Sequence, residues 1–324
     1  MSTFIHRKIK KCKIEIGSSK TAGSYYTIAH MLSVIIPAFY EPFLQKTIDS
    51  ILKNAEGEIE IIPVIDGYIP KPPLKKDPRV RPIRFRKNRG MRAAINAGIK
   101  ASHGKFIMKC DAHCLFGPGY DKIMTENCKS NWLMVPRRYS IDEINWQRNE
   151  NRPVRDYHFV TYPMATRNYG VCMSAQDWYQ KGKERRDPKY DIDDTMTFQG
   201  SCWLANKKYF LKRVGFLDDR RETYSGFGGE QLEIGLKYWL GGGKVKVNKK
   251  TWYAHLAKRY RHYKAGIFAK SYKRNPDTAP SRTWSTKHWI NNEEPGMIHP
   301  FSWLVEKFWP VPTWPEDRSL WQLT

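Results

Sequence analysis

LSVIIPAFYE, residues 32–41, opens the part of the chain that decides the fold. Its first six residues, Leu32 to Pro37, form a continuous apolar run rich in β-branched side chains. Such a run is typical of a strand buried on both faces of a mostly parallel sheet. Apolar residues recur at helical spacing over 43–52 and predict a helix directly after this strand. A strand followed at once by a helix indicates an α/β domain.

The alternation of strands and helices continues beyond this pair. The pattern predicts strands at 59–65 and 80–85, a helix at 91–101, and a strand that begins at 105–108 and runs into Cys110–Asp111. We therefore expect a Rossmann-like, mostly parallel sheet flanked by helices and joined by right-handed crossovers. Ligands bind beyond the carboxyl ends of such strands, where Asp66, Asp111 and His113 lie.

The second half of the chain is less regular. Residues 134–194 are polar, rich in Arg and Tyr, and read as loops and short strands over the active face. Further on, the pattern predicts strands at 197–205 and 244–247 and helices near 207–214 and at Glu230–Leu240. From about residue 274 the tail is rich in Pro and Trp, and is either a packed extension or a separate contact surface.

Charge is the main compositional signal. The 324 residues include 56 Lys and Arg against 32 Asp and Glu, a net charge of +24, so polyanions are the expected partners. No apolar stretch of about 18 residues exists, and no secretion signal precedes the charged segment 6–13, so we expect neither a membrane span nor export. The six cysteines are irregularly spaced, which favours reduced thiols in a cytoplasmic compartment.

KCDAHC, residues 109–114, is the strongest chemical motif. Asp111 and His113 are two residues apart on an extended segment, so they project to the same side and can share one divalent ion. Mixed oxygen and nitrogen ligation suits Mn²⁺ or Mg²⁺ with phosphate oxygens completing the shell. Two other readings stay open: Asp111 caps the next turn, or Cys110, His113 and Cys114 form part of a zinc site, although no second ligand pair follows at structural-zinc spacing.

Six motifs resemble one family. LSVIIPAFYE at 32–41, VIDG at 64–67, NRGMRAAINAG at 88–98 and KCDAHC at 109–114 resemble the family-2-like glycosyltransferases of the GT-A fold. FGGEQLEIGLKYWLGGG at 227–243 and WYAHLAKRYRHY at 252–263 look like the polypeptide N-acetylgalactosaminyltransferases. The resemblance covers about residues 31–264. It divides the chain into a basic N-terminal arm (1–30), a GT-A catalytic domain (31–273) and a C-terminal extension (274–324).

The resemblance implies a role for individual residues. It implies that Asp111, His113 and His255 bind the metal, which neutralises the diphosphate that leaves a UDP-sugar donor. The implied nucleotide-sugar contacts are Asp66 at the base or ribose, Arg89 or Arg92, Phe227, Gly229, Glu230, the diphosphate-gripping pair Lys258 and Arg259, and Tyr263. Phe227 stands where the family has Trp, so packing on the sugar differs. The alternative for 258–263 is a solvated basic face.

Glu230 is the second carboxylate of interest. At the start of a predicted helix its charge is favoured by the helix dipole, and it could orient hydroxyl groups. Inverting relatives have a carboxylate base one residue later, where this chain has Gln231. The missing base favours a retaining transfer. Glu230 acting as the base, or as an ordinary helix acid, remains an alternative.

The acceptor is predicted from charge. A basic chain without a membrane anchor favours a DNA-modifying enzyme that acts on a 5-hydroxymethylpyrimidine, as in viral DNA hypermodification, in the host cytoplasm. The target base would be flipped out or single-stranded, and the stacking candidates are Tyr139, Trp146 and Tyr157 in the loop region 137–190 and the Trp-rich tail. Two alternatives are the same chemistry on a protein or glycan, and a non-catalytic nucleic-acid-binding protein on a transferase scaffold.

Overall fold

A mixed β-sheet forms the centre of the protein. The computed structural model describes residues 31–166, 170–220, 223–224, 229–257 and 278–321. Within these residues a ten-stranded sheet has the order β12-β14-β6-β13-β4-β1-β2-β3, with β5 paired to β14 and β7 paired to β6. Its strands are β1 Leu32–Ala38, β2 Ile59–Asp66, β3 Ile83–Phe85, β4 Phe106–Cys110, β5 Cys114–Phe116, β6 Trp132–Asp142, β7 Gln147–Asn149, β12 Ile192–Asp194, β13 Cys202–Asn206 and β14 Lys244–His255.

The strand directions bring several carboxyl ends to one edge of the sheet. β1 is parallel to both β2 and β4, and β2 is parallel to β3. β13 is antiparallel to β4 and to β6, so β6 runs in the same direction as β4, and β14 is parallel to β6. The carboxyl ends of β1, β2, β4, β6 and β14 therefore share one edge.

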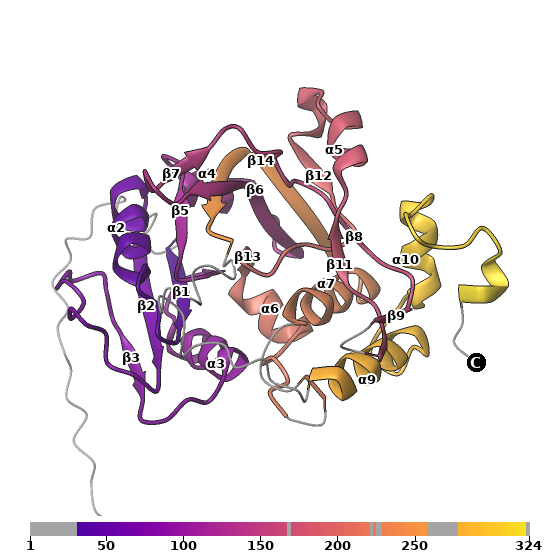
Figure 1. The fold of residues 1–324 in the computed structure, drawn as a ribbon, viewed down its shortest axis with the longest axis horizontal. Helices are drawn as coiled ribbons and strands as arrows, with labels where there is room; N and C mark the ends of the chain where they lie inside the picture. The colour runs from indigo at the N-terminus through magenta and orange to yellow at the C-terminus, as the bar shows by residue number, and fades with distance from the viewer. Residues whose placement is uncertain (1–30, 167–169, 221–222, 225–228, 258–277, 322–324) are drawn as a thin grey trace, which may run out of the picture.

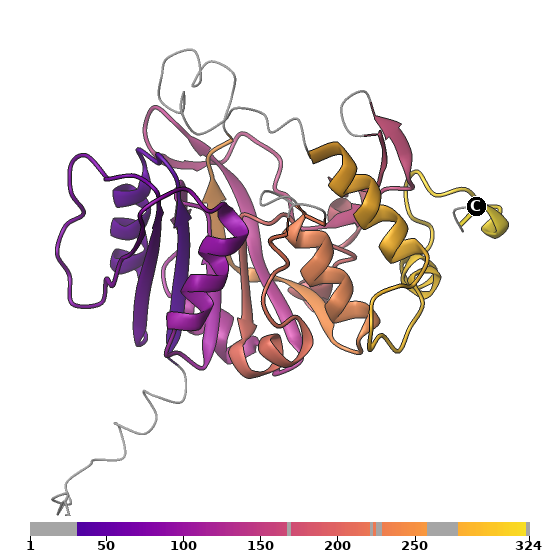
Figure 2. The same ribbon diagram turned by 90° about the horizontal axis from the view of Figure 1, so that it is seen from below.

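Helices cover both faces of the sheet, as the two views of the ribbon show (Figure 1, Figure 2). α2 (Leu44–Asn54) and α4 (Tyr120–Asn127) pack on one face, and α3 (Met91–Ala101), α6 (Lys207–Arg213) and α7 (Glu230–Leu240) pack on the other. In β1, Ile35 belongs to one apolar core and Val34 and Ile36 to the other. The predicted two-sided burial and the predicted helices are confirmed.

The C-terminal extension packs on the core. It contains α9 (Thr278–Ile290), α10 (Phe301–Phe308) and the short 3₁₀ helix η2 (Arg318–Trp321). Trp289, Trp314 and Trp321 are buried in the core that α7 contributes to. Trp314 Nε1 donates a hydrogen bond to the carbonyl of Val160 at 2.8 Å. Of the two expectations for the tail, the structure has the packed extension.

The middle of the chain departs from the prediction. The sequence predicts loops and short strands over residues 134–194, but Trp132–Asp142 forms the long strand β6, in which half-buried and buried positions alternate over 137–140. The strand expected at 244–247 continues to His255, past a register shift between Asn248 and Trp252. The polar residues 248–250 interrupt the apolar pattern, so the sequence did not predict that the strand continues. The part of β14 after them is a strand because it pairs with β6, which is a tertiary contact. The strand expected at 197–205 begins later, at Cys202.

Smaller elements fill the remaining connections. β8 (His158–Val160) pairs with β11 (Ala175–Asp177), and β9 (Met164–Thr166) pairs with β10 (Gly170–Cys172). They are followed by α5 (Tyr179–Glu184) and the 3₁₀ helix η1 (Pro188–Tyr190). The five cysteines of the described segments are buried and free. None of the helices in these segments combines the length and the apolar character that crossing a bilayer requires.

Two helical glycines give a matched test of this packing. A Cβ atom on Gly98 of α3 would lie 2.3 Å from Ile35 Cγ2, whereas one on Gly235 of α7 would lie 3.5 Å from its nearest neighbour, Phe198 Cε1. Gly98→Ala should lower the free energy of unfolding by about 1–3 kcal/mol through overpacking. Gly235→Ala should leave it unchanged or raise it by up to about 1 kcal/mol, because Ala favours the helix.

Urea unfolding followed by circular dichroism measures both changes. Equal effects of the two substitutions would show that α3 does not pack on β1 as closely as described.

Candidate active site

Asp66 organises the loop at the end of β2. Its side chain is 2% exposed and accepts hydrogen bonds from Asn88 Nδ2 (2.7 Å) and the backbone amides of Arg89 (2.7 Å) and Gly90 (2.9 Å). Burial raises the pKa of the Asp66 carboxyl, and the two backbone donors oppose that rise. Asp66 thus fixes the turn that leads into α3, at the expected edge of the sheet.

Three side chains converge beyond β4 and β14. The ligand atoms of Asp111, His113 and His255 all lie within 4.8 Å of one another. Asp111 Oδ2 is 3.1 Å from His255 Nε2 and 3.9 Å from His113 Nε2. Ligands of one octahedral ion at about 2.1 Å are about 3 Å apart, so the three residues fit a shared divalent cation after a small adjustment. Asp111 and His113, which the sequence motif selected, thus lie close to His255, which the family resemblance selected.

Neighbouring side chains orient the two imidazole rings. His113 Nδ1 lies 3.2 Å from Glu41 Oε2, which leaves Nε2 directed at Asp111 and available to an ion. Arg138 Nη2 lies 3.4 Å from His255 Nδ1. Because a guanidinium group only donates, this contact places the ring proton of His255 on Nε2. A metal ion held at Nε2 would require that proton to sit on Nδ1, the nitrogen that faces Arg138.

The protonation states also suit a cation. Burial lowers the pKa of His255 to about 3, so the ring is neutral, as a metal ligand must be. Burial alone would raise the pKa of Asp111, but the charge of Lys109 and the hydrogen bond from His255 hold it well below its ordinary value. Asp111 is therefore a carboxylate at neutral pH.

Lys109 connects Asp111 to Glu230. Its ammonium group is 1% exposed and lies 2.7 Å from Asp111 Oδ1, 2.8 Å from Glu230 Oε1 and 2.7 Å from the carbonyl of Gly200. The charges of the two carboxylates raise the pKa of Lys109 despite its burial. All three ammonium protons have acceptors, so a fixed positive charge lies beneath the metal ligands.

Glu230 begins α7, directly after Gly229, whose φ is 69°. Its side chain is 3% exposed. A Cβ atom on Gly200 would lie 2.7 Å from Glu230 Oε1, so the carboxylate depends on a glycine at that position. The prediction that Glu230 lies at a helix N-terminus is confirmed.

The zinc alternative is not favoured. In the stretches that the structure describes, Asp111, His113 and His255 form the one group of three or more His, Cys, Asp or Glu side chains close enough to hold an ion. Cys110 and Cys114 instead belong to the apolar core on the α2 side of the sheet, and burial raises the pKa of both thiols. Protonated thiols in that environment are inert.

The two arginines predicted to hold the nucleotide have different surroundings. Arg89 is exposed, with its guanidinium 4.9 Å from the Phe85 ring. Arg92 is fully buried, donates to the carbonyl of Asp218 at 2.9 Å, pairs with Glu233 and stacks on Tyr224 at 4.1 Å. Arg92 therefore joins α3 to α7, and its direct contact with a nucleotide stays a prediction. Four other predicted contacts lie outside the described residues: Phe227, Lys258, Arg259 and Tyr263.

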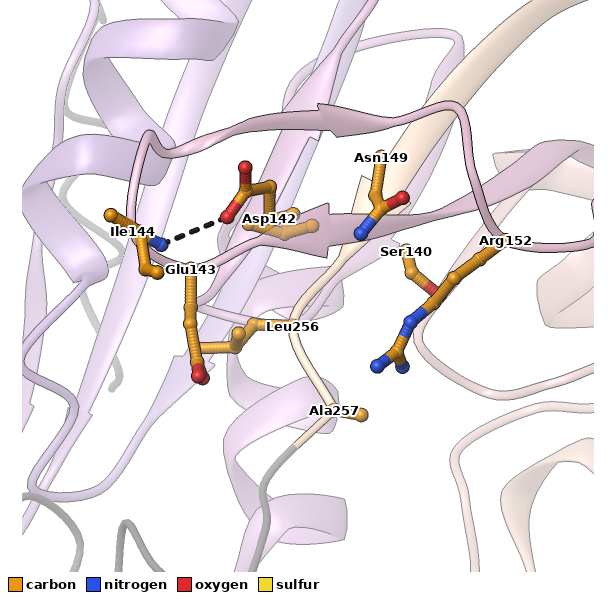
Figure 3. A pocket seen from close by; sticks show the side chains of 9 residues that line it. Ser140, Asp142, Glu143, Ile144, Asn149, Arg152, Leu256 and Ala257 are labelled. Carbon is orange, nitrogen blue, oxygen red and sulfur yellow. Dashed lines mark hydrogen bonds between the residues drawn. The ribbon is translucent and has the colours of Figure 1, made fainter.

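A cavity of about 160 Å³ lies next to His255, whose register partner Ser140 is one of its lining residues. The ends of β6 and β14 and the β6–β7 hairpin form its walls, and His255 directly precedes the lining residues Leu256 and Ala257. In Figure 3, the Arg152 guanidinium points toward Ala257, and Glu143 lies next to Leu256. Its polar lining residues are Ser140, Asp142, Glu143, Asn149 and Arg152. It therefore offers charged and hydrogen-bonding groups to a polar ligand.

Sequence reasoning gave no role to Lys109, Glu41 or Arg138. A signal existed for Lys109, because a lysine inside an apolar strand requires a carboxylate partner. Glu41 follows the first predicted strand, so the strand-end rule that selected Asp66 applies to it as well. Arg138 lies on β6, which the sequence did not predict, and no local pattern marks it.

Curated proteins with similar sequences support the motif-based resemblance. The chain is 24% identical to mouse polypeptide N-acetylgalactosaminyltransferase 4 over 321 residues, which is 94% of this chain and 52% of the relative. It is 23% identical to human polypeptide N-acetylgalactosaminyltransferase 18 over 235 residues, 70% of this chain and 35% of the relative. The chain spans about half, or less, of the length of these relatives.

A solved structure and a family model also match this chain. A crystal structure of GalNAc-T7 with UDP, GalNAc and Mn²⁺ matches with a TM-score of 0.59 at 18% identity, covering 86% of this chain and 57% of that one. The likeness confirms the GT-A fold. The model of the family described as Glycosyl transferase family 2 matches residues 33–213, more than half of the chain, including Asp66, Lys109, Asp111 and His113. The chain therefore belongs to the family described as Glycosyl transferase family 2.

Proposed function

We propose that this glycosyltransferase moves a sugar from a UDP-sugar to a 5-hydroxymethylpyrimidine in DNA. It would use Mn²⁺ or Mg²⁺ held by Asp111, His113 and His255. The observation that carries the proposal is the convergence of these three ligands above the Lys109–Glu230 pair at one edge of the sheet. The ion, when bound, supplies positive charge to the leaving diphosphate.

The protein's own residues prepare this site. Lys109 occupies Asp111 Oδ1, so Asp111 offers Oδ2, the oxygen that faces both histidines. The fixed ammonium adds positive charge in a water-excluded position, where electrostatic stabilisation is strongest. Glu230 is held by the same ammonium and would orient sugar hydroxyl groups.

The donor nucleotide is assigned to the β2 side of the metal ligands. Asp66 and exposed Arg89 lie there, and we assign them the base or ribose and the phosphates. GalNAc-T7, which shares the fold, binds UDP, which supports a UDP-sugar donor. Phe227, Lys258, Arg259 and Tyr263 keep their family-based roles at the sugar and diphosphate as part of this proposal.

The acceptor is assigned to the opposite side. The cavity of Figure 3 lies at the ends of β6 and β14, whereas Asp66 ends β2 and Asp111 follows β4. The metal ligands thus separate a donor side from an acceptor side. Of the three stacking candidates in 137–190, Tyr157 is buried with its hydroxyl donating to Asp193 at 2.9 Å, so Tyr139 and Trp146 remain in that region.

DNA is favoured as the acceptor by charge. The relatives carry the name polypeptide N-acetylgalactosaminyltransferase, so a protein acceptor is the main alternative. A net charge of +24 suits a phosphate backbone better than a Ser/Thr-rich peptide. The 5-hydroxymethyl group supplies a hydroxyl nucleophile that ordinary bases lack, and the cytoplasm, a host's if the chain is viral, is the compartment such an acceptor implies.

The first test is an acceptor panel. With Mn²⁺ and a set of UDP-sugars, an oligonucleotide with 5-hydroxymethylcytosine or 5-hydroxymethyluracil should gain the mass of one sugar, read by intact mass spectrometry. Asp111→Asn should lower this transfer at least about 100-fold, because one metal ligand and its charge are weakened. Asp219→Asn, the same change at an exposed aspartate, is the matched control. Mass gained only by a Ser/Thr-rich peptide would overturn the DNA acceptor.

Removing the ammonium tests the buried pair. Lys109→Met leaves buried Glu230 and half-buried Asp111 without a cation, and should lower the free energy of unfolding of the metal-free protein by about 3–5 kcal/mol. Adding Glu230→Gln should recover about 1 kcal/mol or more, because the two sites interact directly. Urea unfolding in a chelator measures the full cycle. Additive effects would contradict the contact between Lys109 and Glu230.

Retention of the sugar's configuration is the third expectation. Gln231 replaces the carboxylate base of inverting relatives, and Glu230 Oε1 is occupied by Lys109. NMR of the transferred sugar should therefore show the anomeric configuration of the donor. An inverted product would contradict this expectation and would make Asp142 and Glu143, the carboxylates that line the cavity, the candidates for the base.

A further inference from the structure

We propose that the connection from β2 to α3, through edge strand β3, is the surface that binds the phosphate backbone of duplex DNA. This inference rests on the proposed DNA acceptor and names where it docks. Residues 71–89 contain nine Lys or Arg and one acidic residue, Asp77, a net charge of +8. One third of the chain's net charge of +24 is therefore concentrated in 19 residues.

Most of these cations have no acidic partner. Lys75 pairs with Asp49, Arg79 with Asp77, and Arg81 with Glu60. The other six are exposed, and across the described segments no carboxylate lies within ion-pair distance of them. These six are Lys71, Lys76, Arg84, Arg86, Lys87 and Arg89, of which Arg89 is assigned to the donor phosphates and the other five to DNA. Uncompensated charge of one sign repels itself, so its retention favours a polyanionic ligand.

The segment is held against the sheet. Arg79 and Arg81 exchange backbone hydrogen bonds of 2.8 Å with Ile61 of β2, and the backbone amide of Lys75 donates to Gln45 Oε1 at 2.9 Å. Leu74 and Val80 pack on the α2-side core. The cations therefore stand on an ordered backbone, which reduces the entropy lost when they bind phosphates.

β3 is the last strand on this side of the sheet. Ile83 and Phe85 face the core, so Arg84 points away from it. Charged residues on an edge strand also prevent edge-to-edge pairing, but charges of either sign serve that purpose. Because nearly all the charges in this segment are positive, the segment indicates a phosphate backbone as its ligand. Figure 2 shows the 67–82 loop projecting from the same side.

The surface is continuous with the donor side of the active site. Asn88 and Arg89 at the end of the segment, and Gly90 directly after it, donate hydrogen bonds to Asp66. Between β3 and β6 lie β2, β1, β4 and β13, so about five strand spacings of about 4.8 Å separate this surface from the acceptor cavity. That separation of about 24 Å corresponds to about seven base pairs of duplex at about 3.4 Å each.

The test compares two triple variants with equal net charge. R84Q/R86Q/K87Q removes three unpaired cations of the segment, none of them assigned to the donor or metal site. K208Q/K212Q/K244Q removes three exposed lysines, two on α6 and one at the start of β14. Both elements begin at the edge of the sheet opposite to the one that carries the active site. Thermal unfolding checks that both variants fold. Binding of an unmodified duplex of about 20 base pairs is measured by fluorescence anisotropy between about 50 and 200 mM salt.

We expect the first variant to bind at least about tenfold more weakly and to lose about 2–3 from the slope of log affinity against log salt. The control variant should keep the wild-type slope. Equal slopes for the two variants would overturn the proposal, as would tighter binding of an acidic polysaccharide than of the duplex. Loss of slope without any sugar transfer to DNA would support this surface and contradict the proposed function instead.

Discussion

The buried ammonium group of Lys109 is the interaction on which the active site depends. It joins Asp111 after β4, Glu230 at the start of α7 and the carbonyl of Gly200 before β13. Two carboxylates this close to each other repel when both are charged, and a lysine this deeply buried is stable only when paired. The three segments therefore stabilise one another, and the position of α7 is coupled to that of Asp111.

The direction of the strands explains why chemistry gathers at one edge. Of the strands that end there, five contribute to the site: they supply Glu41 beyond β1, Asp66, Asp111, the cavity residues that end β6, and His255. Each residue is backed by a buried strand, so the positions are rigid although the side chains come from distant parts of the chain. His255 reaches the site because β14 continues past an irregularity and pairs with β5 beside Cys114.

Charge is segregated between the interior and the surface. The acidic groups of the site, buried Glu230 and half-buried Asp111, are compensated by Lys109, whereas the unpaired cations of 71–89 lie on an edge strand and its loops. Charges buried in a low local dielectric interact strongly with the groups beside them, because little water screens them. Exposed cations act over about one Debye length, near 8–10 Å at physiological salt. The first arrangement suits chemistry on a diphosphate and the second suits attraction of a polyanion.

Local pattern alone determined much of this protein. Two-sided burial of β1, the helix at Met91–Ala101 and the helix at Glu230–Leu240 all follow from the spacing of apolar residues, and Asp66, Asp111 and His113 follow from their place after strands. His255 entered only through the family resemblance. Tertiary structure alone decided the rest: β6, the full length of β14, the contact of Lys109 with Glu230, and the cavity beside His255. The physical reason is that these features depend on pairing between segments about 100 residues apart, for which a local pattern contains no signal.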